Sequence, residues 1–195
     1  MNPPRFWRWC RALPIMAMLL VAGLCIGVEH LPGTLARRFL VPVDHREAIL
    51  ESSERHGVDP RLVCAIIKCE SNWNANAQSD AGAQGLMQLM PDTSSELAMG
   101  GVVDGGTYDP ANLFDPTTNI EYGSAYLGEL YGLLGSTDEV IAAYNAGPGS
   151  VSSWLEGGDE ISNVIAYPET AVYLVSVQET YKRYQDLYTE TLSER

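Results

Sequence analysis

The chain has 195 residues, of which 46% are hydrophobic and 19% are charged. This composition fits one globular domain and excludes a disordered chain. The 25 acidic residues outnumber the 12 lysines and arginines, and the formal net charge is −13. Since phosphate binding requires a basic surface, this charge excludes a nucleic-acid-binding protein.

The first 30 residues have the pattern of a membrane-targeting segment. Arg5, Arg8 and Arg11 precede an uncharged, apolar run of 17 residues from Ala12 to Val28. Basic residues before such a run keep the N-terminus in the cytoplasm, so we expect the remainder of the chain outside it. The run is short for a spanning helix, which needs about 20 residues, but long for a cleavable signal. Residues 1–30 are therefore predicted to form a single-pass signal-anchor helix in the cell membrane.

Two alternatives to an uncleaved anchor stay open. The first is secretion after signal cleavage. No Ala-x-Ala motif follows the run, and the bonds after Gly23 and Gly27 are only weak cleavage sites. The second is lipid modification of Cys25, which Leu24 disfavours because a small residue should precede a modified cysteine.

A linker over residues 31–43 is predicted to lead into a helical domain over residues 44–190. Prolines and a glycine interrupt the linker. Asp44 is expected to cap a helix that ends near residue 56. Asp59, followed by Pro60 at the first helical position, is expected to cap a second helix that ends near Glu70. Apolar residues at helical spacing indicate that this second helix buries one face.

The rest of the domain is also expected to be helical, without a convincing strand. Asp115 before Pro116 and Ser136 three residues before Glu139 are helix-start signals. The expected segments are 83–90, 92–99, 116–134, 136–144, 151–155 and 168–188, separated by loops at 74–82 and 100–112. Along the last helix, the residues predicted to recur on its apolar side are Val172, Val175, Tyr181, Tyr184 and Tyr188.

Cysteine and histidine give no sign of a metal or redox site. Cys64 and Cys69 lie five residues apart on a predicted helix, so they point roughly 140° apart and cannot form a disulfide. His30, His45 and His56 are too scattered to form a metal site. We therefore expect no metal and no cofactor.

Glu70 is the candidate catalytic acid. It ends a buried amphipathic helix, beside Cys69 and Ser71 and close to Trp73. Apolar and aromatic surroundings disfavour a charged carboxylate and raise its pKa, which suits a general acid near neutral pH. The alternative is a solvated residue at a helix end. Glu70 and its neighbours alone favour that alternative, because the chain has 25 acids.

Two further segments carry the groups that bind sugars. Residues 85–88 place Met87 beside Gln88, and residues 142–149 place Tyr144 beside Asn145 before a Gly-Pro-Gly break. Amides match hydroxyl and acetamido groups, and apolar surfaces match the C–H faces of sugar rings. Taken singly, a methionine such as Met87 is more often a core residue than a ligand contact, and a tyrosine such as Tyr144 is more often a half-buried strut.

Together these motifs resemble a known family. Glu70-Ser71, then Gly85-Leu86-Met87-Gln88, then Ala143-Tyr144-Asn145-Ala146-Gly147-Pro148-Gly149 resemble, in order and spacing, the catalytic domain of soluble lytic transglycosylases. The resemblance covers residues 44–188, and the short anchor resembles that of membrane-anchored members. It implies a mainly α, lysozyme-like fold with Glu70 as the single acid/base residue. The substrate-binding residues that it implies are Ser71, Met87, Gln88, Tyr144, Asn145, Glu169 and Tyr173.

The resemblance also implies a reaction. Peptidoglycan is cleaved without water at the β-1,4 bond between N-acetylmuramic acid and N-acetylglucosamine. Glu70 protonates the leaving oxygen, the substrate's acetamido group stabilises the anomeric carbon, and Glu70 then deprotonates the muramic 6-hydroxyl to give a 1,6-anhydro end. Substrate assistance replaces the second carboxylate of ordinary glycosidases. The implied partners are glycan strands and, through residues 1–30, the membrane; we expect a monomer.

Three other functions remain as alternatives. A goose-type lysozyme would use water held by further acids, for which Asp80 is the one candidate, while Leu89 stands where an Asp would favour hydrolysis. A non-catalytic peptidoglycan-binding protein on the same fold would lack Glu70. A purely structural domain would have no reason to gather these glutamate, amide and tyrosine side chains.

Overall fold

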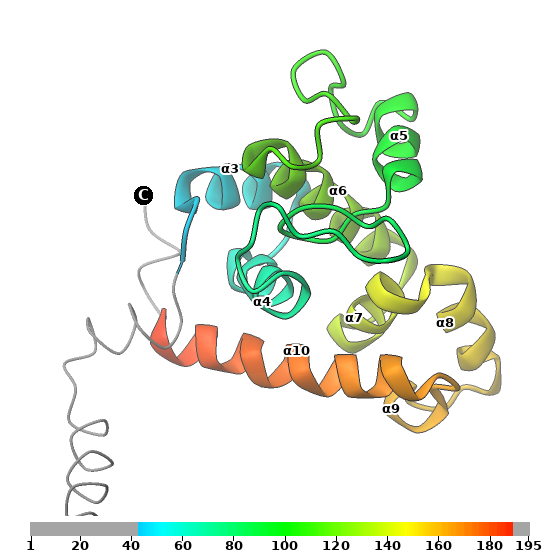
Figure 1. Cartoon of the computed structure of the whole chain (residues 1–195). Coiled ribbons are helices and arrows are strands. Elements are labelled where there is room, and N and C mark those ends of the chain that lie inside the picture. Colours follow the sequence, from blue (N-terminus) through cyan, green and yellow to red (C-terminus); the bar gives the residue numbers. More distant parts are fainter. Residues whose placement is uncertain (1–42, 189–195) are drawn as a thin grey trace, which may run out of the picture. The chain divides into compact units, whose positions relative to one another are not determined.

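The computed structural model describes residues 43–188, in which helices are joined by irregular loops, as the sequence predicts (Figure 1). The helices are α3 (Arg46–His56), α4 (Pro60–Glu70), α5 (Pro91–Met99), α6 (Pro116–Leu133), α7 (Thr137–Ala146), α8 (Pro148–Trp154), the 3-10 turn Leu155–Gly157, α9 (Ile161–Val164) and α10 (Pro168–Leu187). Within this region no helix has both the length and the apolar character needed to cross a membrane. The predicted anchor, residues 1–30, lies outside the described residues.

Helices α6 and α10 organise the domain. Helix α6 packs against α3, α5 and α7, and nearly every residue of its first half is buried. Helix α10 runs along one side of the domain and packs against α4 and α7 (Figure 1). Between them, α4 buries six consecutive residues, from Leu62 to Ile67. The buried helix that ends at Glu70 is therefore held on both sides.

Most of the predicted start signals are confirmed. The carboxylate of Asp59 accepts a hydrogen bond from the Arg61 N–H (2.8 Å), and that of Asp115 accepts one from the Thr118 N–H (2.8 Å). Ser136 Oγ accepts from the Glu139 N–H (3.3 Å). These caps satisfy backbone donors that have no partner inside the helix.

The predicted start of the first helix is wrong. Helix α3 begins at Arg46 after His45, whose φ of 53° is left-handed, and no side chain caps it. A capping residue needs an extended backbone to aim its side chain at the first free N–H groups. The left-handed His45 stands at that position, so the exposed Asp44 does not cap.

The predicted helix over residues 83–90 is also wrong. This segment is a turn in which Gln84 and Leu89 exchange two backbone hydrogen bonds, of 2.9 and 3.0 Å. Gly85 and Gln88 have φ values of 78° and 48°, and left-handed residues interrupt the hydrogen-bond ladder of a right-handed helix. The segment is short and apolar, and such a sequence is compatible with either a turn or a helix.

Two segments after α7 also differ from expectation. Helix α8 begins at Pro148, three residues earlier than predicted, because a proline is tolerated at the first helical position. The four-residue α9 was not predicted.

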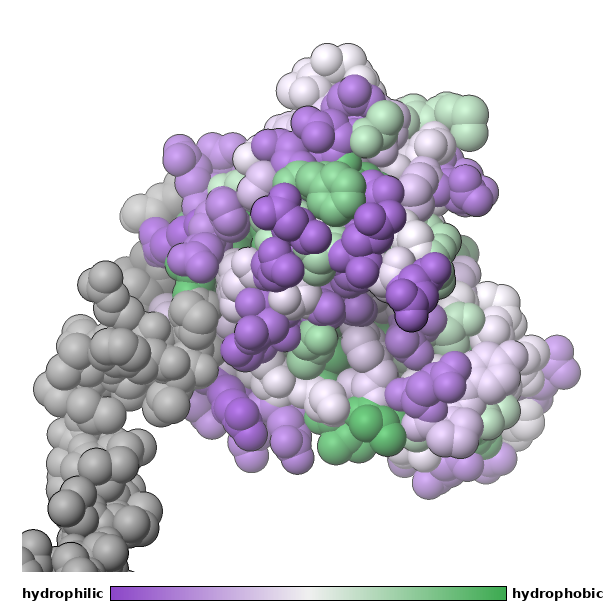
Figure 2. Space-filling view, viewed as in Figure 1, coloured by the Kyte–Doolittle hydropathy of each residue, from purple (hydrophilic) through white to green (hydrophobic). Residues whose placement is uncertain are grey.

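The predicted apolar face of α10 is wrong in its first half. Val172 and Val175 are 67% and 53% exposed, whereas Leu174 and Val177 are buried with Thr170. Val172 is two residues from Thr170 and Leu174, about 200° around the helix, so it points away from α4 and α7. Figure 2 shows a hydrophobic spot at the lower edge of the molecule, where α10 runs, and another in the upper half of the same face.

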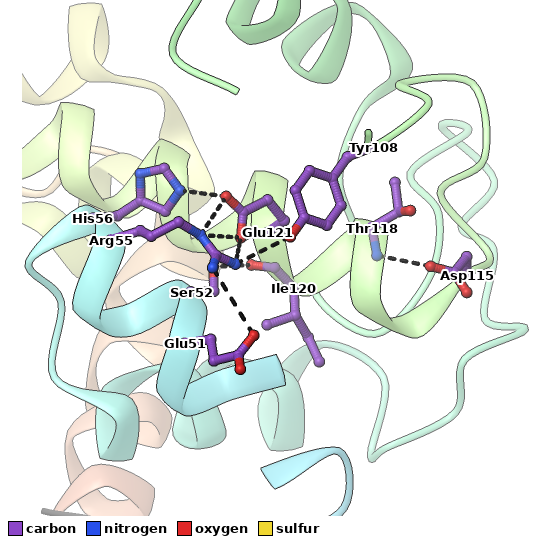
Figure 3. A network of polar contacts seen from close by, with 9 residues as sticks. All are labelled: Glu51, Ser52, Arg55, His56, Tyr108, Asp115, Thr118, Ile120 and Glu121. Carbon is purple, nitrogen blue, oxygen red and sulfur yellow. Dashed lines mark hydrogen bonds and ion pairs between the residues drawn. The ribbon is translucent and has the colours of Figure 1, made fainter. Parts of the chain in front are cut away.

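A charge network ties α3 to α6 (Figure 3). Glu121 in α6 has a side chain only 4% exposed. Arg55 in α3 donates two hydrogen bonds to Glu121 Oε2, of 2.6 and 3.2 Å, and His56 Nε2 lies 2.9 Å from Oε1. Burial by itself raises the pKa of Glu121, but the bonds from His56, Arg55 and Ser52 outweigh it and hold this pKa at about 2.

Candidate active site

Glu70 lies at the C-terminal end of α4, against α10. The hydroxyl of Tyr173 donates a 2.6 Å hydrogen bond to Glu70 Oε1. Burial raises the pKa of Glu70 and the bond from Tyr173 partly offsets this rise, so that the pKa is about 7 instead of 4.5. At neutral pH the carboxyl is therefore divided between its protonated and ionised forms, as acid/base exchange requires.

The backbone after Glu70 is held in an unusual turn. Asn72 and Trp73 are both left-handed, with φ values of 51° and 66°, a conformation that is costly for bulky residues. The Trp73 indole N–H donates to the Tyr184 hydroxyl on α10 (3.3 Å), and Lys68 donates to the Asn72 side chain. These contacts fix the end of α4, and with it the position of Glu70.

The side chain of Ser71 faces its own helix. Its hydroxyl donates to the carbonyl of Ile67 (3.2 Å), and the residue is half-buried beside Glu70. This bond closes the last turn of α4, so Ser71 supports the backbone from which Glu70 projects.

The turn over residues 84–89 holds one polar and one apolar candidate. The Gln88 amide Nε2 donates to the carbonyls of Ala77 (3.0 Å) and Gly85 (2.9 Å), which fixes the side chain. Met87 is fully buried, and its sulfur lies against Gly123 in α6. Two residues after Gln88, Met90 is 41% exposed. Met90 is the exposed apolar group of this segment and was not among the predicted site residues.

Tyr144 joins this turn to α7. Its hydroxyl donates to the carbonyl of Met87 (2.9 Å), and its ring lies 5.4 Å from the ring of Tyr126, measured between centroids. Burial raises its pKa well above the usual value for a tyrosine, and the charge of Glu70 raises it further. Tyr144 therefore stays neutral beside Glu70, with its hydroxyl directed to the backbone of the turn.

Asn145 and Glu169 lie where α7 meets the start of α10. Asn145 is exposed, and its side-chain oxygen accepts a 2.7 Å hydrogen bond from the buried Thr170 hydroxyl. Glu169 is exposed in the first turn of α10. Asp80, the candidate for a second carboxylate, is exposed in the loop over residues 74–82.

Of the predicted residues, the structure brings together Glu70, Tyr173 and Tyr144 with the backbone of Met87. Whether each predicted residue contacts a substrate stays a prediction. Among residues 43–188 there is no group of three or more metal-ligating side chains.

A groove of about 380 Å³ adjoins this site between α5, α6 and the start of α8. Tyr126, which contacts Tyr144, and Pro148, which begins α8, both line it. Leu97, Leu130 and Leu133 are among its apolar lining residues. The groove gives an extended ligand room beyond Tyr144.

Replacing Tyr173 with phenylalanine is expected to raise the pKa of Glu70. The lost hydrogen bond stabilises the carboxylate, and bonds to a charged group contribute about 1.5–3 kcal/mol, so we expect the titration midpoint to rise by roughly 1–2 pH units. Carbon-detected NMR of the Glu70 carboxyl would measure it. Tyr181→Phe is the matched control, because Tyr181 lies on the same helix and donates instead to Asp59 (2.7 Å). An unchanged midpoint in Tyr173→Phe would show that this bond does not tune Glu70.

The comparisons identify the class of protein that this fold and site define. Residues 47–163 match the sequence model of the Transglycosylase SLT domain family. The chain therefore belongs to this family, and the family predicted from the motifs is confirmed.

Two curated relatives are similar to the domain. Soluble lytic murein transglycosylase of Escherichia coli strain K12 is 39% identical over 137 residues, which cover 70% of this chain and 21% of that protein. Membrane-bound lytic murein transglycosylase C of Edwardsiella ictaluri is 40% identical over 134 residues, 65% of this chain and 36% of that protein. The chain thus spans between 21% and 36% of the length of these relatives.

Solved structures agree with this assignment. The 70-kDa soluble lytic transglycosylase of Escherichia coli matches with a TM-score of 0.71 and 29% identity, over 78% of this chain and 26% of that chain. An inactive Glu-to-Gln mutant of lytic transglycosylase Slt from Pseudomonas aeruginosa matches with a TM-score of 0.69 and 30% identity, over 75% and 24%. The mainly α fold is therefore shared with these enzymes.

Proposed function

We propose that this domain is a peptidoglycan lytic transglycosylase. It cleaves the β-1,4 bond between N-acetylmuramic acid and N-acetylglucosamine and leaves a 1,6-anhydromuramic end. The observation that carries this proposal is the carboxyl of Glu70, whose pKa is about 7 and which is hydrogen-bonded to Tyr173. The lytic transglycosylases among the relatives support the reaction, and the inactive Pseudomonas form, a Glu-to-Gln mutant, supports a glutamate as its acid.

In the proposed reaction one carboxyl moves a proton in both directions. Protonated Glu70 donates to the glycosidic oxygen as the bond to the anomeric carbon breaks. The substrate's acetamido oxygen stabilises the positive charge at this carbon. Ionised Glu70 then takes the proton from the muramic 6-hydroxyl, whose oxygen bonds to the anomeric carbon. Glu70 ends protonated and no water is consumed. One positioned proton donor accelerates such a step by roughly 10²–10⁴-fold.

Around Glu70, the proposed substrate contacts are polar groups with apolar surface between them. Gln88, Asn145 and Tyr144 offer amide and hydroxyl groups to the sugar. Ser71, Glu169 and Tyr173 complete the proposed set. Exposed Met90 supplies apolar surface more directly than Met87, which is buried beneath the turn. The groove beside Tyr126 takes the strand beyond the reacting sugars.

The mass of the products tests the proposal. Purified peptidoglycan is incubated with the protein, and the released fragments are weighed. Lytic transglycosylase activity gives anhydro ends, each lighter by one water than a reducing end. Reducing ends would instead establish a hydrolase, and intact glycan a binding protein.

We also propose that residues 1–30 anchor the domain to the cell membrane, with the catalytic part outside the cytoplasm. The basic and apolar pattern of this segment supports an anchor, and the Edwardsiella relative is named as membrane-bound. Fractionation of cells that express the full chain tests this. Protein in the membrane fraction at full length supports the anchor, whereas a shortened soluble protein establishes signal cleavage.

A further inference from the structure

Asn119 is a buried polar residue in the first turn of α6, four residues after the capping Asp115. Its side chain is fully buried. The amide Nδ2 donates to the carbonyls of Gln84 (2.8 Å) and Leu113 (2.9 Å), and Oδ1 accepts from the Met87 N–H (2.7 Å). Both donors and one acceptor site of the amide are thus used. All three bonds go to backbone groups outside α6, so Asn119 fixes two segments of chain to this helix.

One of these segments is the turn beside the candidate active site. The backbone of Met87 is held from two sides, because its N–H donates to Asn119 and its carbonyl accepts from the Tyr144 hydroxyl (2.9 Å). Gln88 follows directly, and its amide is bonded within the same turn. A displacement of Met87 therefore moves Gln88 and removes the partner that orients Tyr144 beside Glu70.

Gly85 shows how closely the turn approaches Asn119. A Cβ at this position would lie 2.1 Å from the Leu113 carbonyl oxygen and 2.3 Å from Asn119 Nδ2. Gly85 also has a φ of 78°. Only glycine fits both the left-handed backbone and the contact. The position of the turn is thus set by a direct contact with the Asn119 amide.

We propose that Asn119 is a positioning residue for the transglycosylase reaction. It acts through the Met87 backbone on Tyr144 and Gln88 and does not itself contact substrate. This inference rests on the proposed function. Removing the Asn119 side chain leaves the buried Met87 N–H and Leu113 carbonyl without this hydrogen-bond partner, which lowers stability. A displacement of about 1 Å at an active site costs as much as 10²-fold in rate. A loss of kcat in the folded protein is therefore expected in addition to the loss of stability.

The test compares Asn119→Ala with Ser124→Ala. Ser124 lies in the same helix and is fully buried, and its hydroxyl has no hydrogen-bond partner among the described residues. We expect Asn119→Ala to lower kcat on peptidoglycan by at least about 10-fold with a less than about 3-fold change in KM. Ser124→Ala is expected to match the wild type. Unfolding of each variant is followed, so that kcat is measured on folded protein.

A double-variant cycle separates positioning from general stability. If Asn119 acts through Tyr144, then Asn119→Ala combined with Tyr144→Phe lowers kcat no further than the worse single variant. Independent, multiplicative losses would overturn the proposal. So would a folded Asn119→Ala protein with the kcat of the wild type.

Gly85→Ala displaces the same contact from the other side and serves if Asn119→Ala does not fold. Its control is Gly82→Ala, because Gly82 also has a positive φ (94°) but no atom within 4 Å of the added Cβ. If Gly85→Ala lowers kcat and Gly82→Ala does not, the positioning role is supported. Equal losses of kcat in the two variants overturn it. If the wild type itself leaves peptidoglycan intact, the proposed function and this inference both fail. If only the variants behave as wild type, the inference fails alone.

Discussion

Glu70→Gln is expected to abolish turnover of peptidoglycan while its affinity for glycan stays within a few-fold of wild type. Glutamine keeps the size and hydrogen-bonding capacity of the carboxyl but can neither donate nor accept the transferred proton. We expect a loss of at least about 10²–10⁴-fold in kcat, the usual contribution of a positioned proton donor. Product release and glycan pull-down measure the two effects. Glu156→Gln, at an exposed glutamate, is the control. Substantial residual turnover would remove Glu70 from its role.

The pKa of Glu70 gives this prediction a pH dependence. The first step needs the protonated form, so kcat/KM is expected to fall as pH rises through about 7. Stability should follow the same titration. Because the folded chain holds this proton more tightly than the unfolded chain, the resulting stabilisation is fully present below pH 4.5 and is lost as pH rises through about 7.

Urea unfolding tests the stability effect without any substrate. Glu70→Gln has no charge to bury at high pH. Its free energy of unfolding, relative to that of the wild type, is therefore expected to rise by roughly 2–3 kcal/mol between pH 5 and pH 9. Glu156→Gln should show no such gain. A difference between Glu70→Gln and wild type that does not change with pH would mean that Glu70 titrates as an ordinary exposed carboxyl.

The sequence predicted the parts of the fold that depend on neighbouring residues. Asp59, Asp115 and Ser136 cap helices where expected, because a cap is a contact between residues two or three positions apart. The family resemblance implied a site role for Tyr173, and the structure places its hydroxyl in hydrogen-bond contact with Glu70. Local signals and a motif order were thus enough to find the centre of the candidate site.

What the sequence did not predict depends on contacts between distant segments. Asn119 contacts Met87, 32 residues away, and Glu121 contacts His56, 65 residues away. No pattern in the sequence near either residue reveals its partner. An asparagine and a glutamate among the apolar residues of a predicted helix were an available signal, because a polar side chain that becomes buried needs a hydrogen-bond partner. Met87 and Met90 are methionines in the same short apolar stretch, so the sequence does not show which of them is buried. The turn that includes Gly85 decides this.

Arg55 and Glu121 form an ion pair, but replacing one of them is expected to cost more stability than replacing the other. Arg55 is 43% exposed, whereas the Glu121 side chain is 4% exposed. Removing Glu121 leaves an arginine that water can solvate. Removing Arg55 leaves a buried carboxylate with less compensation, and breaking a buried pair in this way costs about 3–5 kcal/mol. We therefore expect Arg55→Met to lower the free energy of unfolding by about 3 kcal/mol or more, and Glu121→Gln by less.

Urea unfolding of both variants and of their double mutant measures this asymmetry. The double mutant should be more stable than Arg55→Met alone, because it no longer buries a charge. Glu51→Gln is the matched control, since Glu51 pairs with the same arginine at 4.0 Å but is 51% exposed, and its loss should cost less than about 0.5 kcal/mol. Equal costs for Glu121→Gln and Arg55→Met would contradict the argument from burial.

Acid unfolding adds an independent check on Glu121. Its pKa is lower in the folded chain, about 2 instead of 4.5, so its stabilising contribution is fully present above pH 4.5 and is lost as pH falls through about 2. The difference in unfolding free energy between wild type and Glu121→Gln should therefore shrink over this range. A constant difference would show that Glu121 is not held ionised by α3. Because α3 and α6 meet through this residue, the same titration is expected to loosen their packing in acid.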